Sequence, residues 1–154
     1  MGESVETEKM LNALLEKNYD AQRGYATAAE DVKHVQLKRW FAKQGKVRTQ
    51  FCAELAGEMK RMNMEPNNDG SVLGDLHRQW MDIKSFLSLN TQESILEECL
   101  RGEQASLDEY NDVLEHRGEL APTIVTILEN QRHTIQMTIA KENSLEAIAD
   151  EKDV

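Results

Sequence analysis

The chain has 154 residues, 40% of them hydrophobic and 30% charged, a balance typical of one globular domain. Its 28 acidic residues outnumber the 18 basic ones, and the formal net charge of -10 argues against nucleic-acid and membrane partners. No apolar run is long enough to span a membrane, and the acidic start MGESVETEK lacks the basic and apolar regions of a signal peptide. Cys52 and Cys99 lie inside helical patterns, as expected for reduced core thiols. We therefore expect a single cytoplasmic domain over residues 1–154.

Apolar residues recur at three- and four-residue steps along most of the chain, which predicts helices rather than strands. The first predicted helix covers residues 4–33 and the second covers residues 36–62, with a break near His34. Residues 64–70, MEPNNDG, contain a proline, two asparagines and an Asp-Gly pair, and they are predicted to form a loop.

The second half of the chain contains one short and two long predicted helices. The short helix covers residues 72–88. Thr91 is positioned to cap the next long helix, and Gly118 is expected to end it. Pro122 lies in the opening turn of the last helix, predicted for residues 120–148.

Four long helices and one short helix, in this order, are typical of a ferritin-like bundle. The short helix stands where that fold needs a crossover along the length of the molecule. We therefore predict an all-α, ferritin-like four-helix bundle with a short helical crossover between the second and third long helices. In this topology those two long helices run parallel. The tail, residues 148–154, is expected to fray.

Polar residues interrupt the apolar seam of every long helix near its middle. At 1.5 Å per residue, Arg48 and Glu103 both lie roughly 20 Å from a predicted turn, which is mid-height in such a bundle. Polar groups at one level on four helices predict a shared layer. This core polar layer comprises Asn18, Gln22, Gln44, Arg48, Glu103 and Gln131.

The chemistry of the layer leaves two interpretations open. A buried guanidinium alone costs several kcal/mol, so Arg48 needs an anion, and Glu103 is the only carboxylate in the seams. The amides can supply donors and acceptors for the remaining polar groups. The layer is therefore either a satisfied polar network that fixes helix register, which we favour, or a binding or metal site at the same level.

A metal centre of the usual kind lacks its ligands. A carboxylate-bridged di-metal bundle needs two Glu-x-x-His pairs facing inward, and none of the 4 histidines has a glutamate three residues before it. This predicts no cofactor. The alternative is a divergent iron or manganese site built from glutamates alone, for which the candidate metal ligands are Glu54, Glu58, Glu98 and Glu103.

Four stretches carry a family resemblance: DAQRGYATAAE (20–30), RTQFCAEL (48–55), GSVLGDLHRQWMDIK (70–84) and ILEECLRGEQASLDEY (95–110). Together they resemble a bacterial family of domains of unknown function placed in the ferritin-like superfamily. The resemblance implies the bundle fold and a bacterial source. It implies no reaction, and a stress-related role is the common expectation for relatives.

The third of these stretches predicts ionisable groups on the inner face of the crossover helix. His77 and Lys84 fall on its apolar stripe, with Trp80 as the apolar anchor. The crossover motif comprises His77, Arg78, Trp80 and Lys84. A histidine in an apolar stripe is more often structural than catalytic, so we expect this motif to dock the crossover against acidic flanks of the bundle.

These patterns favour a non-enzymatic, stress-related or interaction protein that acts by association, with a homo-oligomer as one form of it. A divergent metal-binding bundle is the alternative function. No catalytic residue is predicted.

Overall fold

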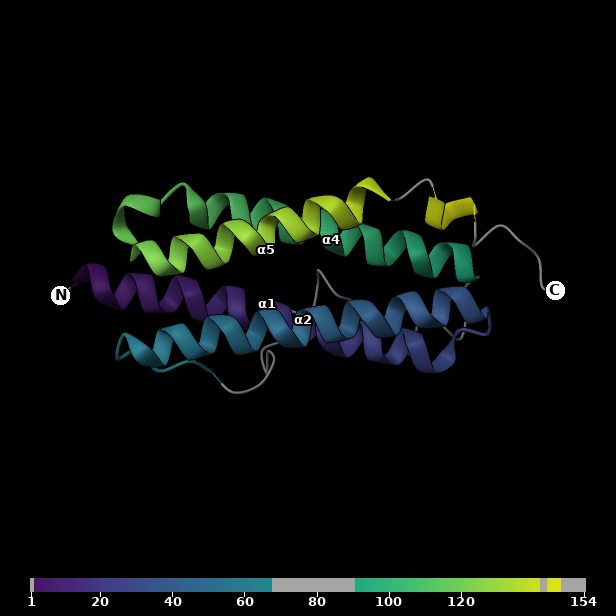
Figure 1. The fold of residues 1–154 in the computed structure, drawn as a ribbon, viewed down its shortest axis with the longest axis horizontal. Coiled ribbons are helices and arrows are strands. Elements are labelled where there is room, and N and C mark those ends of the chain that lie inside the picture. Colours follow the sequence, from purple (N-terminus) through teal and green to yellow (C-terminus); the bar gives the residue numbers. More distant parts are fainter. Residues whose placement is uncertain (1, 68–90, 142–143, 148–154) are drawn as a thin grey trace.

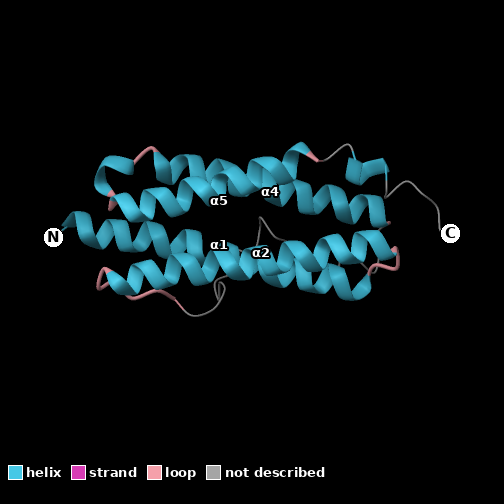
Figure 2. Ribbon diagram, in the orientation of Figure 1, coloured by secondary structure: helices cyan, strands magenta, loops and turns pink. Residues whose placement is uncertain are grey.

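The computed structural model describes residues 2–67, 91–141 and 144–147, and this part of the chain is helical and contains no strand (Figures 1 and 2). Its helices are α1 (Gly2–Asp31), α2 (Val35–Arg61), α4 (Gln92–Leu114), a short 3-10 helix η2 (Arg117–Glu119) and α5 (Pro122–Ala140). A further helical turn covers residues 144–147. The predicted all-α class and the four long helices are confirmed.

The helices form two layers, α1 with α2 and α4 with α5 (Figure 1). The first residues of α2 and α4 meet at one end of the bundle, where the His34 N–H donates to Gln92 Oε1 at 2.7 Å. At the other end the Thr123 hydroxyl, in the first turn of α5, donates to Glu58 near the end of α2 at 2.5 Å. Helices α2 and α4 therefore run parallel, as the sequence predicted. The predicted crossover helix, residues 72–88, lies outside the described residues.

The two long helices of the second layer end earlier than predicted. Helix α4 ends at Leu114, because the chain tightens into η2 and Gly118 sits inside that turn without the positive φ of a helix-ending glycine. Helix α5 ends at Ala140 rather than near residue 148. Its last turns carry Thr134 and Thr138, whose hydroxyls donate to carbonyls four residues earlier, a bond that weakens and bends helices.

Helix α2 ends in a Schellman motif. Asn63 adopts a left-handed φ of 62°, the Met64 N–H donates to the Met59 carbonyl at 2.9 Å, and the Asn63 N–H donates to the Lys60 carbonyl at 3.0 Å. Asparagine tolerates this conformation better than most residues. The motif turns the chain back along α1, where the Glu65 N–H donates to Glu8 at 3.0 Å.

The apolar core is divided into two clusters, one toward each end of the bundle. The first cluster contains the buried residues Leu11, Leu14, Leu15, Phe51, Cys52, Leu55, Met59, Tyr110, Val113, Leu114, Leu120, Ile124, Leu128 and Ile135. The second contains Ala21, Tyr25, Ala28, Val32, Leu37, Phe41, Ile95, Leu96, Cys99, Leu100 and Leu145. Both cysteines are buried and free. Charged and amide side chains lie between the two clusters.

Within the described residues, no helix combines the length and the apolar character needed to cross a membrane.

Candidate functional site: a buried polar layer

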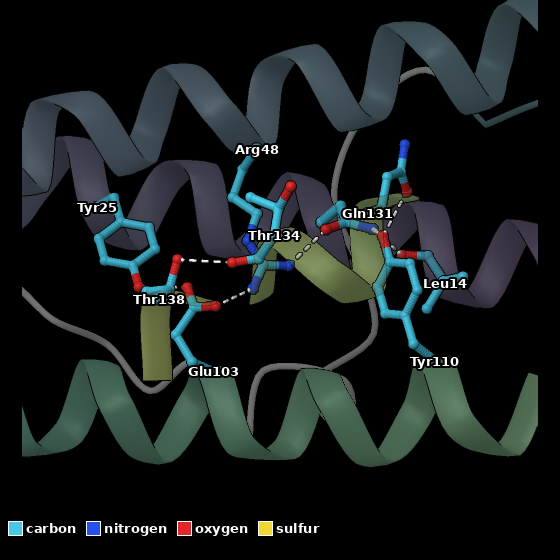
Figure 3. A network of polar contacts seen from close by, with 9 residues as sticks. Leu14, Tyr25, Arg48, Glu103, Tyr110, Gln131, Thr134 and Thr138 are labelled. Carbon is cyan, nitrogen blue, oxygen red and sulfur yellow. Dashed lines mark hydrogen bonds and ion pairs between the residues drawn. The ribbon is translucent and has the colours of Figure 1, made fainter. Parts of the chain in front are cut away.

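Each of the four long helices contributes a polar side chain to one buried layer. Asn18 comes from α1, Arg48 from α2, Glu103 from α4 and Gln131 from α5, and each is 1% exposed. In Figure 3 Arg48 and Glu103 reach toward each other from opposite sides of the bundle. Burial of four polar groups at one level requires that they satisfy one another.

An ion pair joins the two parallel helices. Arg48 Nη2 donates to Glu103 Oε1 at 2.8 Å, and Arg48 Nη1 donates to Asn18 Oδ1 at 2.6 Å. The guanidinium carbon also lies 5.5 Å from the centre of the Phe51 ring, within cation-π range. Burial is the largest single influence and favours a lower pKa for Arg48, but the negative charge of Glu103, the nearby Tyr110 and Tyr25 phenols and the hydrogen bond to Glu103 together outweigh it, so the pKa of the guanidinium is raised. Arg48 is therefore held as a cation.

The second oxygen of Glu103 is also engaged. The Tyr25 hydroxyl donates a hydrogen bond to Glu103 Oε2. Burial, followed by the nearby negative charge of Glu103, raises the pKa of the Tyr25 phenol well above its ordinary value. Tyr25 thus stays neutral and acts as a donor, so both carboxylate oxygens have partners.

A second branch continues the network toward α5. Asn18 Nδ2 donates to the Tyr110 hydroxyl at 2.9 Å, and that hydroxyl donates to Gln131 Oε1 at 2.6 Å. Gln131 Nε2 donates to the Phe51 carbonyl at 3.2 Å and to Glu54 Oε1 at 3.0 Å. The hydrogen bonds therefore form one continuous chain across all four long helices, with the members Tyr25, Glu103, Arg48, Asn18, Tyr110, Gln131 and Glu54.

The structure brings four of the six residues predicted for the layer into this network and leaves two outside it. Gln44 is buried and Gln22 is half-buried. Among the residues that the structure describes, no hydrogen bond connects either amide to the network. Gln44 is buried in the core, but neither amide takes part in the hydrogen-bonded network of the described residues.

Three members of the network, Tyr25, Tyr110 and Glu54, are not among the residues predicted for the layer. The tyrosines could have been included, because a buried tyrosine hydroxyl usually requires a hydrogen-bond partner. The signal was present, because Tyr25 and Tyr110 each lie seven residues after a polar layer residue, Asn18 and Glu103 respectively.

The glutamates considered as metal ligands have other partners. Glu58 pairs with Arg61 and accepts from Thr123, and Glu98 pairs with Arg101 at 2.7 Å. Glu54 and Glu103 belong to the hydrogen-bonded chain described above. Over residues 2–67, 91–141 and 144–147, no group of three or more His, Cys, Asp and Glu side chains is placed to hold a metal ion.

The crossover motif, His77, Arg78, Trp80 and Lys84, lies outside the described residues, and its predicted docking stays a prediction.

The part of the chain that matches a protein family includes most members of the network. The model of a family described as a domain of unknown function (DUF2383) matches residues 6–116. The chain belongs to this family. The DUF2383 match includes most of α1 and all of α2 and α4, and therefore Asn18, Tyr25, Arg48, Glu103 and Tyr110, whereas Gln131 on α5 lies beyond it. No curated protein matches the chain.

Proposed function

We propose that this DUF2383 protein is a ferritin-like bundle without a reaction of its own, acting as a stress-related protein through association with other chains. The observation that carries the proposal is that the polar groups of the layer bind one another. Arg48 and both oxygens of Glu103 bind other residues of the same chain. Groups that satisfy each other in a closed core are typical of a register-fixing network rather than of a site waiting for substrate.

The topology supports the ferritin-like assignment. Helices α2 and α4 run parallel, so their connection joins opposite ends of the bundle, as in the one-crossover bundles of that fold. We also propose a cytoplasmic setting, which the buried free thiols of Cys52 and Cys99 support.

We further propose that no iron or manganese is resident in the layer. The two charges of the pair neutralise each other, and a metal ion bound to Glu103 would lie beside the Arg48 guanidinium, which repels it. Glu54, Glu58 and Glu98 also have donors in other residues.

Metal content of the native protein tests this proposal. The full chain is purified without chelator from iron- and manganese-supplemented cells, and its metals are counted by elemental analysis. We expect far less than one ion per chain and ferrous oxidation no faster than in buffer. Stoichiometric metal that disappears in Glu103→Gln but persists in Glu98→Gln would overturn the proposal and establish the metal-binding alternative.

Association is tested separately by light scattering and by cross-linking of the full chain. We expect self-association or a defined protein partner. A strictly monomeric chain that captures no partner from stressed cells would count against the interaction role.

A further inference from the structure

The two buried tyrosines of the layer differ in the group that receives their hydroxyl proton. Tyr25 donates to the Glu103 carboxylate, whereas Tyr110 donates to the amide oxygen of Gln131 at 2.6 Å. Both phenols are 0% exposed. A carboxylate can take up a proton, but an amide oxygen is far too weakly basic to do so. Tyr25 therefore has a proton acceptor built into its hydrogen bond, and Tyr110 does not.

This difference determines which tyrosine can lose an electron. Removing an electron from a phenol makes its hydroxyl strongly acidic, and a buried cationic radical is costly in an apolar core. Oxidation inside the bundle is therefore feasible only where the proton can leave together with the electron. The Tyr25 phenol keeps its proton at rest, so it releases the proton only when it is oxidised.

An aromatic side chain connects Tyr25 with the surface. The ring of Trp40, on α2, lies 5.8 Å from the Tyr25 ring in an edge-to-face arrangement, and 5.3 Å from the ring of Phe41. Trp40 is half-buried, whereas Tyr25 is fully buried. Electrons can pass between aromatic rings at contact distance, so the indole is placed to exchange electrons between an external oxidant and Tyr25.

We propose that Tyr25 is a redox-active tyrosine that is oxidised through Trp40, with Glu103 as the acceptor of its proton. A one-electron oxidant such as a peroxyl radical takes one electron from Trp40, is itself reduced by that electron, and leaves an indole radical cation. Tyr25 then passes one electron to the indole and its phenolic proton to Glu103 Oε2. The products are a neutral Trp40, a neutral Tyr25 phenoxyl radical and a neutral Glu103 carboxylic acid.

Arg48 keeps the charge balance of this step inside the layer. Before oxidation its positive charge is neutralised by Glu103 at 2.8 Å. The loss of one electron from Trp40 adds one positive charge to the protein. After the proton has moved, Glu103 is neutral, so this added charge is the positive charge of Arg48, which Glu103 no longer neutralises. Arg48 still donates to Asn18 at 2.6 Å. The role goes beyond the proposed association, because it assigns the layer a capacity to hold an oxidising equivalent away from the surface.

The test uses the full chain and a photogenerated oxidant. A ruthenium tris-bipyridine complex with persulfate as quencher delivers the one-electron oxidation, and electron paramagnetic resonance of rapidly frozen samples detects the phenoxyl radical. We expect a tyrosyl signal in the wild type that is lost in Tyr25→Phe and reduced in Trp40→Phe. Tyr110→Phe and Tyr19→Phe are the matched controls and should retain it.

A second readout separates the proton transfer from the fold. Circular dichroism identifies variants that remain folded, and transient absorption of the wild type in D₂O measures the step without any substitution. We expect slower phenoxyl formation in D₂O than in H₂O, and loss of the signal in folded Glu103→Gln. A tyrosyl signal that survives Tyr25→Phe, that depends on Trp80 rather than on Trp40, or that forms equally fast in D₂O would overturn the proposal.

Discussion

Arg48 and Glu103 form a buried ion pair, 2.8 Å apart, between the two long helices that run parallel and lie diagonally across the bundle. These helices contact their other neighbours, α1 and α5, more extensively than each other. The pair therefore fixes the relative height of two elements that apolar packing alone positions weakly. Displacing either helix by one turn would separate the charges by about 5.4 Å.

A double-mutant cycle measures what the pair contributes. Arg48→Met leaves Glu103 without its cation, and Glu103→Leu leaves a buried guanidinium without its anion. Each single change is expected to lower the free energy of unfolding by about 3–5 kcal/mol, the usual cost of leaving one partner of a buried pair alone. The double variant should recover much of this loss, because neither charge is then desolvated.

The matched control is an exposed ion pair of the same chain. Arg117 and Glu129 lie 3.0 Å apart with side chains 52% and 41% exposed, and their coupling should be about 0–1 kcal/mol. Urea unfolding of both cycles gives the comparison. Equal, small coupling in the two cycles would show that the Arg48–Glu103 pair does not hold the layer together.

The pairing of Arg48 with Glu103 was predictable because a lone buried guanidinium needs an anion and the seams offer one carboxylate. The exclusion of Gln22 was harder to foresee. At roughly 100° per residue, Tyr25 returns to within about 20° of Asn18 on the helix wheel, whereas Gln22 is rotated by about 40° in the other direction. Its polar side chain suggested Gln22 as a member of the layer, but the helical repeat places Tyr25 closer to the direction of Asn18. The partners of Tyr25 and Tyr110 depend on the exact heights and rotations of four helices, which periodicity does not specify.

Tyr110→Phe tests the second branch of the network. The substitution keeps the ring in the core and removes the hydroxyl that joins Asn18 to Gln131. Gln131 Oε1 then lacks its donor in a closed space and Asn18 Nδ2 keeps only its bond to the Leu14 carbonyl at 3.1 Å, so stability should fall by about 1–3 kcal/mol in urea unfolding. A change below about 0.5 kcal/mol, the range of ordinary surface substitutions, would indicate that these amides find other partners.

Cys52 and Cys99 should be inert in the folded protein. Burial raises the pKa of Cys52 to about 12 and also raises that of Cys99, so neither carries appreciable thiolate at neutral pH. Iodoacetamide labelling followed by mass spectrometry should be slow in buffer and fast in denaturant. Native labelling as fast as that of the unfolded chain would show that the core around these thiols opens readily.

Glu58 should titrate far below an ordinary glutamate. Its hydrogen bonds from Arg61 and then from Thr123 lower the pKa of the carboxyl from 4.5 to about 2. Because the folded pKa is depressed, the stabilisation is complete above the unfolded value of 4.5 and disappears as the pH falls toward 2. NMR titration of the Glu58 carboxyl carbon measures the shift directly.

Thr123→Val should raise this pKa toward 4.5, since it removes one donor and leaves Arg61 in place. Thr126→Val is the matched control on the same helix, because Thr126 donates to the Pro122 carbonyl rather than to Glu58. An equal response to both substitutions would show that the contact between α2 and α5 at this end of the bundle does not form in solution, and an unshifted Glu58 in the wild type would show that the bonds from Arg61 do not form either.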